Sequence, residues 1–242
     1  MTSTAINDEF RRARTEEQRQ QRRGHILGTT REMLQGRRLA ELSFNEIARG
    51  VGLAKSNIMR YFESREAILL TLLQEDYAAW VDEVETELAQ SMQPDPIERV
   101  AEVLSRTIMA RSLLCELLTA TPTVLEHNVT TEEIIPFKLG IQASMGRLMT
   151  LLSPALGTWT PEQKGVFLGE LHATVTHTWA LAHPASALEA AYAARPDIAV
   201  MPNPAQVVVR EAIATVLTGL KYRRPLGRPS FMDEPDEGPV SG

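Results

Sequence analysis

The chain has 242 residues, enough for one large or two modest domains, and its 43% of hydrophobic residues supports a substantial core. A single cysteine, Cys115, excludes a disulfide framework within the chain and a metal site built from several cysteines. A formal net charge of −6 excludes a protein that is basic throughout, so any nucleic-acid-binding surface must be confined to one part of it.

The charge is divided unevenly along the chain. Residues 1–70 contain 13 Lys and Arg against 9 Asp and Glu, whereas residues 71–242 contain 12 against 22. A basic N-terminal part on an acidic remainder is the distribution expected when only the N-terminal part meets phosphate. We therefore divide the chain into an arm (1–13), a DNA-binding domain (14–70), an acidic domain (71–222) and a tail (223–242).

Residues 1–13 lack an apolar face, and we expect them to form a mobile basic arm. A basic run crosses its end and continues into the first helix, which we expect to end near Gln35: Arg11, Arg12, Arg14, Arg19, Arg22 and Arg23. These side chains suit contacts with phosphates or the minor groove. The interleaved Glu16 and Glu17 equally fit a solvated helix, and both interpretations stay open.

A helix-turn-helix pattern follows. Ser43 and Glu46 have the spacing of a capping box, in which each side chain bonds the other residue's backbone amide. Apolar residues at helical spacing come next, and Gly50 and Gly52 then free the backbone for a sharp turn.

The second helix of this motif is expected over residues 54–62. Leu53, Ile58 and Phe62 face inward, and the outward face carries donors and a phenol without a carboxylate: Lys55, Ser56, Asn57, Arg60 and Tyr61. Asn, Lys and Arg match acceptors on base edges, while Ser and Tyr reach phosphates. Together with Ser43 and Arg65, these residues are the predicted DNA contacts. A helical hairpin with a solvated polar face is the alternative.

Residues 65–92 predict one long amphipathic helix that starts in the DNA-binding domain and ends in the acidic domain, as a lever would. Further helices are indicated by caps and prolines over 95–118, 121–127, 130–152, 160–183 and 203–220. Residues 184–202 are expected to form a loop, with a short helix near 187–194. No strand pattern appears, so an all-α fold is predicted.

The tail, 223–242, is rich in proline and acidic residues and is expected to be disordered. The polar N-terminus and the shortness of the apolar runs predict a cytoplasmic protein without a signal peptide or membrane span. No cofactor or metal site is predicted.

Residues 26–73 resemble the DNA-binding domain of the TetR family of bacterial repressors. The positions that carry the resemblance are Ile26, Leu27, Met33, Leu34, Ser43, Glu46, Ile47, Ala48, Gly52, Leu53, Ala54, Lys55, Ile58, Phe62, Ser64, Arg65, Glu66 and Ile68. The resemblance implies a helical C-terminal domain for effector binding and dimerisation. It also implies a repressor that leaves a palindromic operator when a small organic molecule binds.

In such proteins the last two long helices form a four-helix interface with a second copy. The residues that we expect there are Val175, Trp179, Val209, Ala212, Ile213, Val216 and Leu220. The family also encloses an effector site among the middle helices. The candidates for it are Arg106, Met109, Leu113, His127, Phe137, Met145, Phe167, Glu170, His172 and Thr176. Apolar walls with a few polar groups suit a small organic ligand. Plain core packing is nevertheless the favoured interpretation of each Met and Phe, and a hydrogen-bonded core or interface histidine is that of His172.

Two other classes of function are weighed against a regulator. An enzyme is disfavoured, because His172 and His177 lie five residues apart and do not share a helical face, and because phosphate-loop and nucleophile-elbow motifs are missing. A helical protein-interaction module without a DNA role is the second alternative. Salt-dependent binding to DNA separates it from a regulator.

Overall fold

The computed structural model describes residues 2–198 and 203–222, with the surroundings of side chains from residue 16 onward. Within these ranges every regular element is a helix and no strand occurs, which confirms the all-α prediction. None of these helices combines the length and the apolar character needed to span a bilayer. The tail predicted at 223–242 lies outside the described residues.

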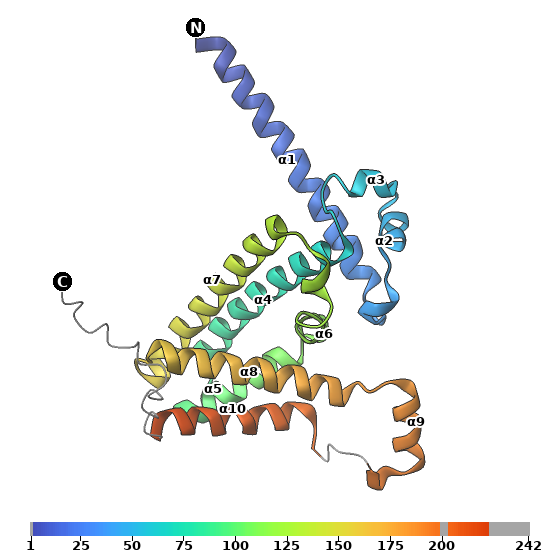
Figure 1. Cartoon of the computed structure of the whole chain (residues 1–242). Helices are drawn as coiled ribbons and strands as arrows, with labels where there is room; N and C mark the ends of the chain where they lie inside the picture. The colour runs from blue at the N-terminus through green and yellow to red at the C-terminus, as the bar shows by residue number, and fades with distance from the viewer. Residues whose placement is uncertain (1, 199–202, 223–242) are drawn as a thin grey trace, which may run out of the picture.

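The N-terminal part, for which DNA binding is predicted and which we call the head, contains three helices and one 3₁₀ turn. These are α1 (Thr2–Met33), η1 (Leu39–Glu41), α2 (Phe44–Val51) and α3 (Lys55–Ile58). Residues 2–13, where we expected an arm, form the first turns of α1, which projects well beyond the rest of the head (Figure 1).

The second helix of the motif is shorter than the predicted 54–62. Regular α-helix ends at Ile58, and hydrogen-bonded turns continue to Phe62, whose amide donates to the Ile58 carbonyl at 3.1 Å. Ala54 supplies no side-chain cap, so the first turn lacks the bond that usually anchors a helix start. Burial of Ile58 and Phe62 fixes the segment instead.

The two glycines of the motif have different roles. Gly52 ends α2 in the left-handed conformation, with φ of 72°, as the predicted sharp turn requires. Gly50 remains helical, and a Cβ built there would lie 2.5 Å from the Met33 sulfur of α1. Gly50 therefore permits α1 and α2 to approach closely and does not make the turn.

The remaining helices form the body. They are α4 (Arg65–Gln90), α5 (Pro96–Met109), α6 (Ser112–Ala120), η2 (Leu125–Asn128), α7 (Thr131–Leu156), α8 (Pro161–Ala182), α9 (Ser186–Ala194), η3 (Pro196–Ile198) and α10 (Ala205–Tyr222). Figure 1 shows α4 and α7 side by side, with α8 and α10 running across their far end. Head and body share α4, whose start packs among the head helices.

Two boundaries differ from the sequence prediction. The helix predicted over 95–118 is broken at Arg111, whose backbone leaves the helical region while its guanidinium pairs with Glu83 of α4 at 2.7 Å. In contrast, α7 continues through Pro154, where we expected it to end. Proline has no amide for the Thr150 carbonyl, and the Ser153 hydroxyl donates to that carbonyl at 2.8 Å instead.

The centre of the body is aromatic and fully hydrogen-bonded. Tyr77 and Trp80 of α4 are completely buried and meet edge to face, with ring centroids 5.2 Å apart. The Trp80 indole donates to the Thr107 hydroxyl at 2.9 Å. His172 Nδ1 donates to the Leu168 carbonyl at 2.7 Å, so its Nε2 accepts from the Tyr77 hydroxyl at 3.1 Å. Burial lowers the pKa of His172 and keeps the ring neutral.

The helices α8 and α10 pack mainly within the protomer. α10 lies on α5 and α8, and α8 lies on α6. Val175, Val209 and Ile213, which we expected at a dimer interface, are at most 2% exposed, and Trp179 is 9% exposed. These four side chains are therefore core residues, and only Ala212, Val216 and Leu220 of the predicted set retain partial exposure.

Gly52→Ala is expected to lower the free energy of unfolding by about 1–2 kcal/mol, because a Cβ is disfavoured at positive φ. Gly146→Ala is the control, since Gly146 lies in α7 with no atom within 4 Å of an added Cβ. There alanine should raise that free energy by about 0.5–1 kcal/mol through helix propensity. Urea denaturation of both variants measures the difference, and equal effects would contradict a left-handed Gly52.

Candidate nucleic-acid interface

The start of α2 is fixed by the predicted capping box. The Ser43 hydroxyl accepts from the Glu46 amide at 3.2 Å, and the Glu46 carboxylate accepts from the Ser43 amide at 2.9 Å. The Ser43 hydroxyl also donates to that carboxylate at 2.8 Å. These bonds to Ser43, followed by one from Arg37, lower the pKa of Glu46 to about 2. The entry into the helix-turn-helix is thus held by charge-assisted hydrogen bonds.

An outward face free of carboxylates runs along α3 and the turn after it. Lys55, Ser56, Asn57 and Arg60 are exposed, and Tyr61 is half-buried. The Lys55 ammonium lies 5.8 Å from the centre of the Phe44 ring, so its stem is directed along the junction of α2 and α3. Short, exposed and rich in donors, this face has the form of a helix that enters the major groove.

Two of the predicted DNA contacts already have partners in their own chain. The Ser43 hydroxyl is engaged by Glu46, as described above. The Arg65 guanidinium is half-buried, donates to the Leu42 carbonyl at 3.0 Å and pairs with Glu66 at 2.8 Å. The structure therefore assigns Arg65 first to anchoring the loop before α2 on the start of α4.

The turn after α3 is held against α1 by Arg23. Its guanidinium donates to the Tyr61 carbonyl and lies 4.0 Å from the centre of the Phe62 ring. Burial, and next the nearby charge of Arg19, lower the pKa of Arg23. This one arginine of the basic run is thus a structural residue that sets the height of α3 above α1.

Head and body are joined by specific polar contacts beside the shared helix. Arg31 of α1 pairs with the buried Asp76 of α4. The Leu39 amide of η1 donates to the Glu116 carboxylate of α6 at 2.8 Å. The Arg38 guanidinium donates to the Pro184 carbonyl, just after α8, at 2.9 Å. The orientation of the head therefore depends on the positions of α4, α6 and the end of α8.

The ten residues predicted to line an effector site are not brought together. Arg106 pairs with Glu87 at the surface, and His127 and Glu170 are exposed. Three others lie on α8: the Phe167 ring meets the Trp159 ring edge to face, the His172 ring is hydrogen-bonded to Tyr77, and the Thr176 hydroxyl donates to the His172 carbonyl. Phe137 and Leu113 line two separate hollows. Met109 and Met145 pack against the hydrophobic core. Spacing along α5–α8 did not specify which faces meet.

Hollows occur instead where head meets body. Two neighbouring hollows have volumes of about 630 Å³ and about 590 Å³. Both are lined by the same four side chains, which form a common wall: Arg38, Glu116, Trp179 and His183. In this shared wall the Trp179 and His183 rings are stacked, with centroids 3.8 Å apart. Both hollows thus border the polar contacts that orient the head.

Comparison with known proteins agrees with this division of the chain. Residues 26–72 match the family described as bacterial regulatory proteins, tetR family. Residues 74–224, more than half of the chain, match the tetracyclin repressor-like C-terminal domain. The chain belongs to the TetR family. It is accordingly a DNA-binding transcriptional regulator, since members of this family are transcription factors and not enzymes.

Curated relatives match this chain over about a fifth of its length. The HTH-type transcriptional regulator EthR of Mycobacterium tuberculosis (strain ATCC 25618 / H37Rv) is 44% identical over 48 residues. EthR of Mycolicibacterium smegmatis is 36% identical over 52 residues. These alignments cover 20% and 22% of this chain and only 22% and 24% of the relatives, so the chain is aligned with less than a quarter of each relative.

Solved structures share the whole TetR fold at low sequence identity. FadR of Bacillus halodurans has a TM-score of 0.53 at 15% identity, covering 81% of this chain and 98% of that one. RolR in complex with resorcinol has a TM-score of 0.52 at 16% identity, covering 88% and 98%. Thermus thermophilus FadR in complex with lauroyl-CoA has a TM-score of 0.50 at 16% identity, covering 85% of this chain and 100% of that one. At such identities the likeness concerns the fold alone.

Three residues in or beside the predicted interface and its contacts with the body were not identified from the sequence: Met59, Leu39 and Glu116. Met59 is 49% exposed on the α3 side of the head, beside the predicted contacts. Leu39 and Glu116, which join head to body, are 77 residues apart. The sequence around Met59 gives no signal of exposure, since a methionine at this spacing resembles a core residue. The Leu39–Glu116 hydrogen bond gives none either, since it arises only from tertiary packing. The prolines and caps that signal helix ends carry no information about such pairs.

Ser43→Ala is expected to destabilise the TetR head by about 1 kcal/mol, the usual cost of a lost N-cap. Because the pKa of Glu46 is depressed in the folded state, its stabilising effect is complete above its ordinary pKa and is lost as pH falls towards about 2. The variant removes the bond from the Ser43 hydroxyl but keeps the one from the Ser43 amide, so it should raise that pKa part of the way towards 4.5, as measured by NMR titration of the carboxyl group. Ser56→Ala, at an exposed serine, should change neither quantity.

Proposed function

We propose that this chain is a dimeric repressor that binds a palindromic operator and leaves it when a small organic effector binds. The observation that carries the proposal is the exposed, carboxylate-free face of α3. Four of the predicted DNA contacts, Lys55, Ser56, Asn57 and Arg60, lie on it with no ion pair among the described residues. The donors on such a face are hydrated in the free protein and can bind phosphates and base edges in place of water.

Dimerisation follows from the size of that face. A regular helix of four residues reaches few bases, so adequate affinity needs a second head one helical turn of DNA away. Two-fold symmetry of the protein then corresponds to a palindrome in the operator.

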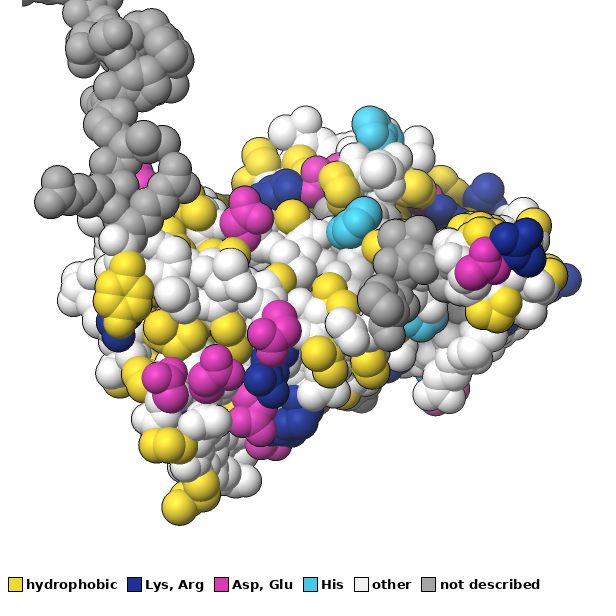
Figure 2. All heavy atoms as spheres, turned by 90° about the horizontal axis from the view of Figure 1, so that it is seen from below, with side chains coloured by type: hydrophobic (Ala, Val, Ile, Leu, Met, Phe, Trp, Pro, Cys, Tyr) yellow, Lys and Arg dark blue, Asp and Glu magenta, His cyan; other side chains and the backbone are white. Residues whose placement is uncertain are grey.

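The outer face of α8 supports the position of the interface. Gly165, Gly169 and Ala173 recur at intervals of four on its exposed side, next to Val166, which is 50% exposed. Small residues at this spacing let a second helix approach closely. Figure 2 views the underside of the molecule, where α8 and α10 lie, and shows apolar side chains on uncharged surface between several groups of charged side chains.

Effector control is supported by the contacts between head and body. A ligand that favours another position of α6 or of the end of α8 would disturb the bonds from Leu39 to Glu116 and from Arg38 to the Pro184 carbonyl. The heads would then no longer match successive major grooves. The lauroyl-CoA and resorcinol complexes of FadR and RolR indicate that this fold accommodates small organic ligands.

Lys55→Ala and Asn57→Ala are expected to weaken DNA binding in different ways. With an operator selected from a random duplex pool, Lys55→Ala should weaken all sequences and lower the salt slope by about 1 for each head. Asn57→Ala should reduce discrimination at one base pair by about 1–3 kcal/mol. Fluorescence anisotropy over a salt series measures both. Absence of salt-dependent binding by the wild type would favour a protein-interaction module instead.

Ala173→Arg is expected to convert the dimer into monomers, because a long cation on the close-approach face of α8 prevents contact. It is a cleaner test than Val216→Asp, since Val216 packs partly on the core of its own protomer. Ala143→Arg, at an exposed alanine of α7, is the matched control and should stay dimeric. Sedimentation equilibrium measures the mass. Dimers of Ala173→Arg would move the interface elsewhere.

A further inference from the structure

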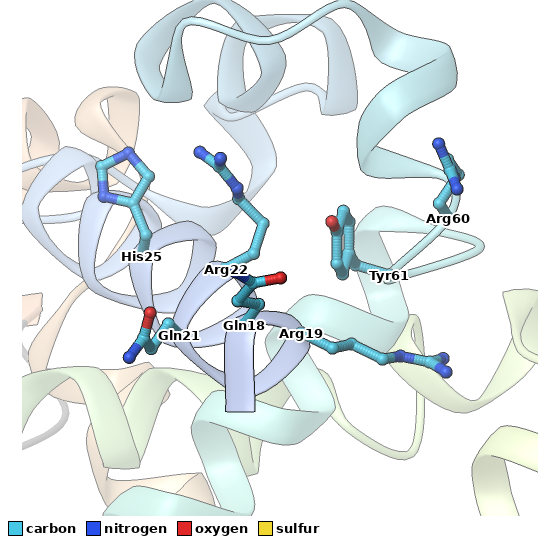
Figure 3. A pocket seen from close by; sticks show the side chains of 7 residues that line it. All are labelled: Gln18, Arg19, Gln21, Arg22, His25, Arg60 and Tyr61. Carbon is cyan, nitrogen blue, oxygen red and sulfur yellow. The ribbon is translucent and has the colours of Figure 1, made fainter. Parts of the chain in front are cut away.

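A groove with many donors lies between α1 and the turn that follows α3. Its volume is about 810 Å³. Five lining residues come from successive turns of α1 and two from the turn after α3: Gln18, Arg19, Gln21, Arg22, His25, Arg60 and Tyr61. Figure 3 shows these side chains arranged around the opening, with the α1 set on one side and Arg60 and Tyr61 on the other. The groove is therefore walled by two segments that are about 40 residues apart in the sequence.

The lining is cationic and contains no carboxylate. Arg19, Arg22 and Arg60 are exposed, and none of the three forms an ion pair within the part of the chain that the structure describes. The other arginines of α1 in this region behave differently, because Arg23 is bound by the Tyr61 carbonyl and Arg31 by Asp76. Three guanidinium groups without an ion-pair partner among the described residues thus line one groove, where an anion with several oxygens can accept hydrogen bonds from them.

The form of the groove distinguishes between kinds of anion. All three guanidinium groups are solvent-exposed, so a free phosphate ion would exchange one hydrated environment for another and gain little. A duplex already docked on α3 presents a row of phosphates at no further cost of association. Rows of cations in open grooves are the usual partners of such a backbone.

The position of the groove agrees with this partner. Arg60 and Tyr61 directly follow α3, so the groove begins where the predicted base-reading face ends. From there α1 continues towards Thr2, away from the body and past α3 (Figure 1). A duplex lying on α3 would thus pass the basic side of α1 beyond the bases that α3 reads.

We propose that this groove binds the phosphodiester backbone of the operator just outside the base pairs read by α3, so that α1 lengthens the DNA site on each side. The proposal rests on the DNA-binding function proposed above. Its contribution is independent of sequence, because guanidinium groups and amides contact phosphate oxygens here and not base edges.

The test compares two duplexes that share the selected operator. The short one ends at the outermost base pairs needed for sequence preference, and the long one adds about six base pairs of arbitrary sequence at each end, about half a helical turn. Wild-type protein should bind the long duplex at least tenfold more tightly. Arg19→Ala with Arg22→Ala should remove this gain and lower the salt slope on the long duplex by about 2 for each head.

The control removes the same number of charges from the body. Arg147 and Arg195 are exposed and pair only with carboxylates of the body surface. Arg147→Ala with Arg195→Ala should therefore keep the wild-type gain on the long duplex. A thermal melt followed by circular dichroism should show both double variants to be folded, since every substituted side chain lies on the surface.

Each other outcome decides against the proposal in a distinguishable way. Equal loss by the Arg19/Arg22 variant on both duplexes would place these residues in the core interface, and no loss on either would remove them from DNA binding. Saturable uptake of inorganic phosphate by the wild type, absent in the variant, would indicate a free-anion site instead. If wild-type protein binds neither duplex in a salt-dependent manner, the proposed function itself is wrong.

Discussion

The shared helix α4 is the constraint on which the rest of the molecule depends. Its first turns bury Ala67, Ile68 and Leu69 in the head, and its later turns bury Tyr77, Trp80 and Val84 in the body. Burial on several sides at both ends makes the helix a rigid connection, since any rotation of the head must either move α4 or expose this apolar surface. Asp76 of α4 is only 8% exposed, and its carboxylate pairs with Arg31 of α1 where head meets body. This ion pair fixes α1 to α4.

Electrostatics in the head depend on which arginines are already paired. The sequence shows a basic N-terminal part, but it does not show that Arg23, Arg31 and Arg65 are occupied by a carbonyl, a buried carboxylate and the start of α4. What remains is a smaller set of free cations on α1 and beyond α3. Because exposed and unpaired charges dominate the attraction for phosphate, this remainder, and not the total, would set the direction from which DNA approaches in the proposed function. The acidic body disfavours the opposite orientation.

The sequence predicted what local chemistry controls. The capping box at Ser43, the helix starts signalled near residues 95 and 160, the sharp turn at Gly52 and the continuity of α4 all appear in the structure, because each depends on residues within one or two turns. The predicted α3 face is likewise exposed. Long-range features were not predictable in this way. Val175 of α8 and Val209 of α10 would show the same apolar pattern at a dimer interface as in the core of one protomer. The structure buries them within the protomer, where α8 packs on α6 and α10 packs on α5, and the sequence pattern does not contain this information. The predicted effector residues likewise lie in different parts of the body, because spacing along the chain does not fix which helix faces meet.

Two short contacts, and not the long helix alone, determine how a change in the body could reach the DNA-binding face. The Leu39 amide needs an acceptor, because a buried donor without a partner costs about 1–3 kcal/mol, and Glu116 on α6 supplies it. On the other side of the same wall Arg38 holds the carbonyl that follows α8. A displacement of α6 relative to α8 cannot satisfy both bonds with η1 unmoved, and η1 leads directly into the capping box of α2. In the proposed response to an effector, a change in the relative position of these two body helices would therefore act on the head. Loss of the Leu39 bond alone has a cost comparable to typical allosteric coupling energies of about 1–3 kcal/mol.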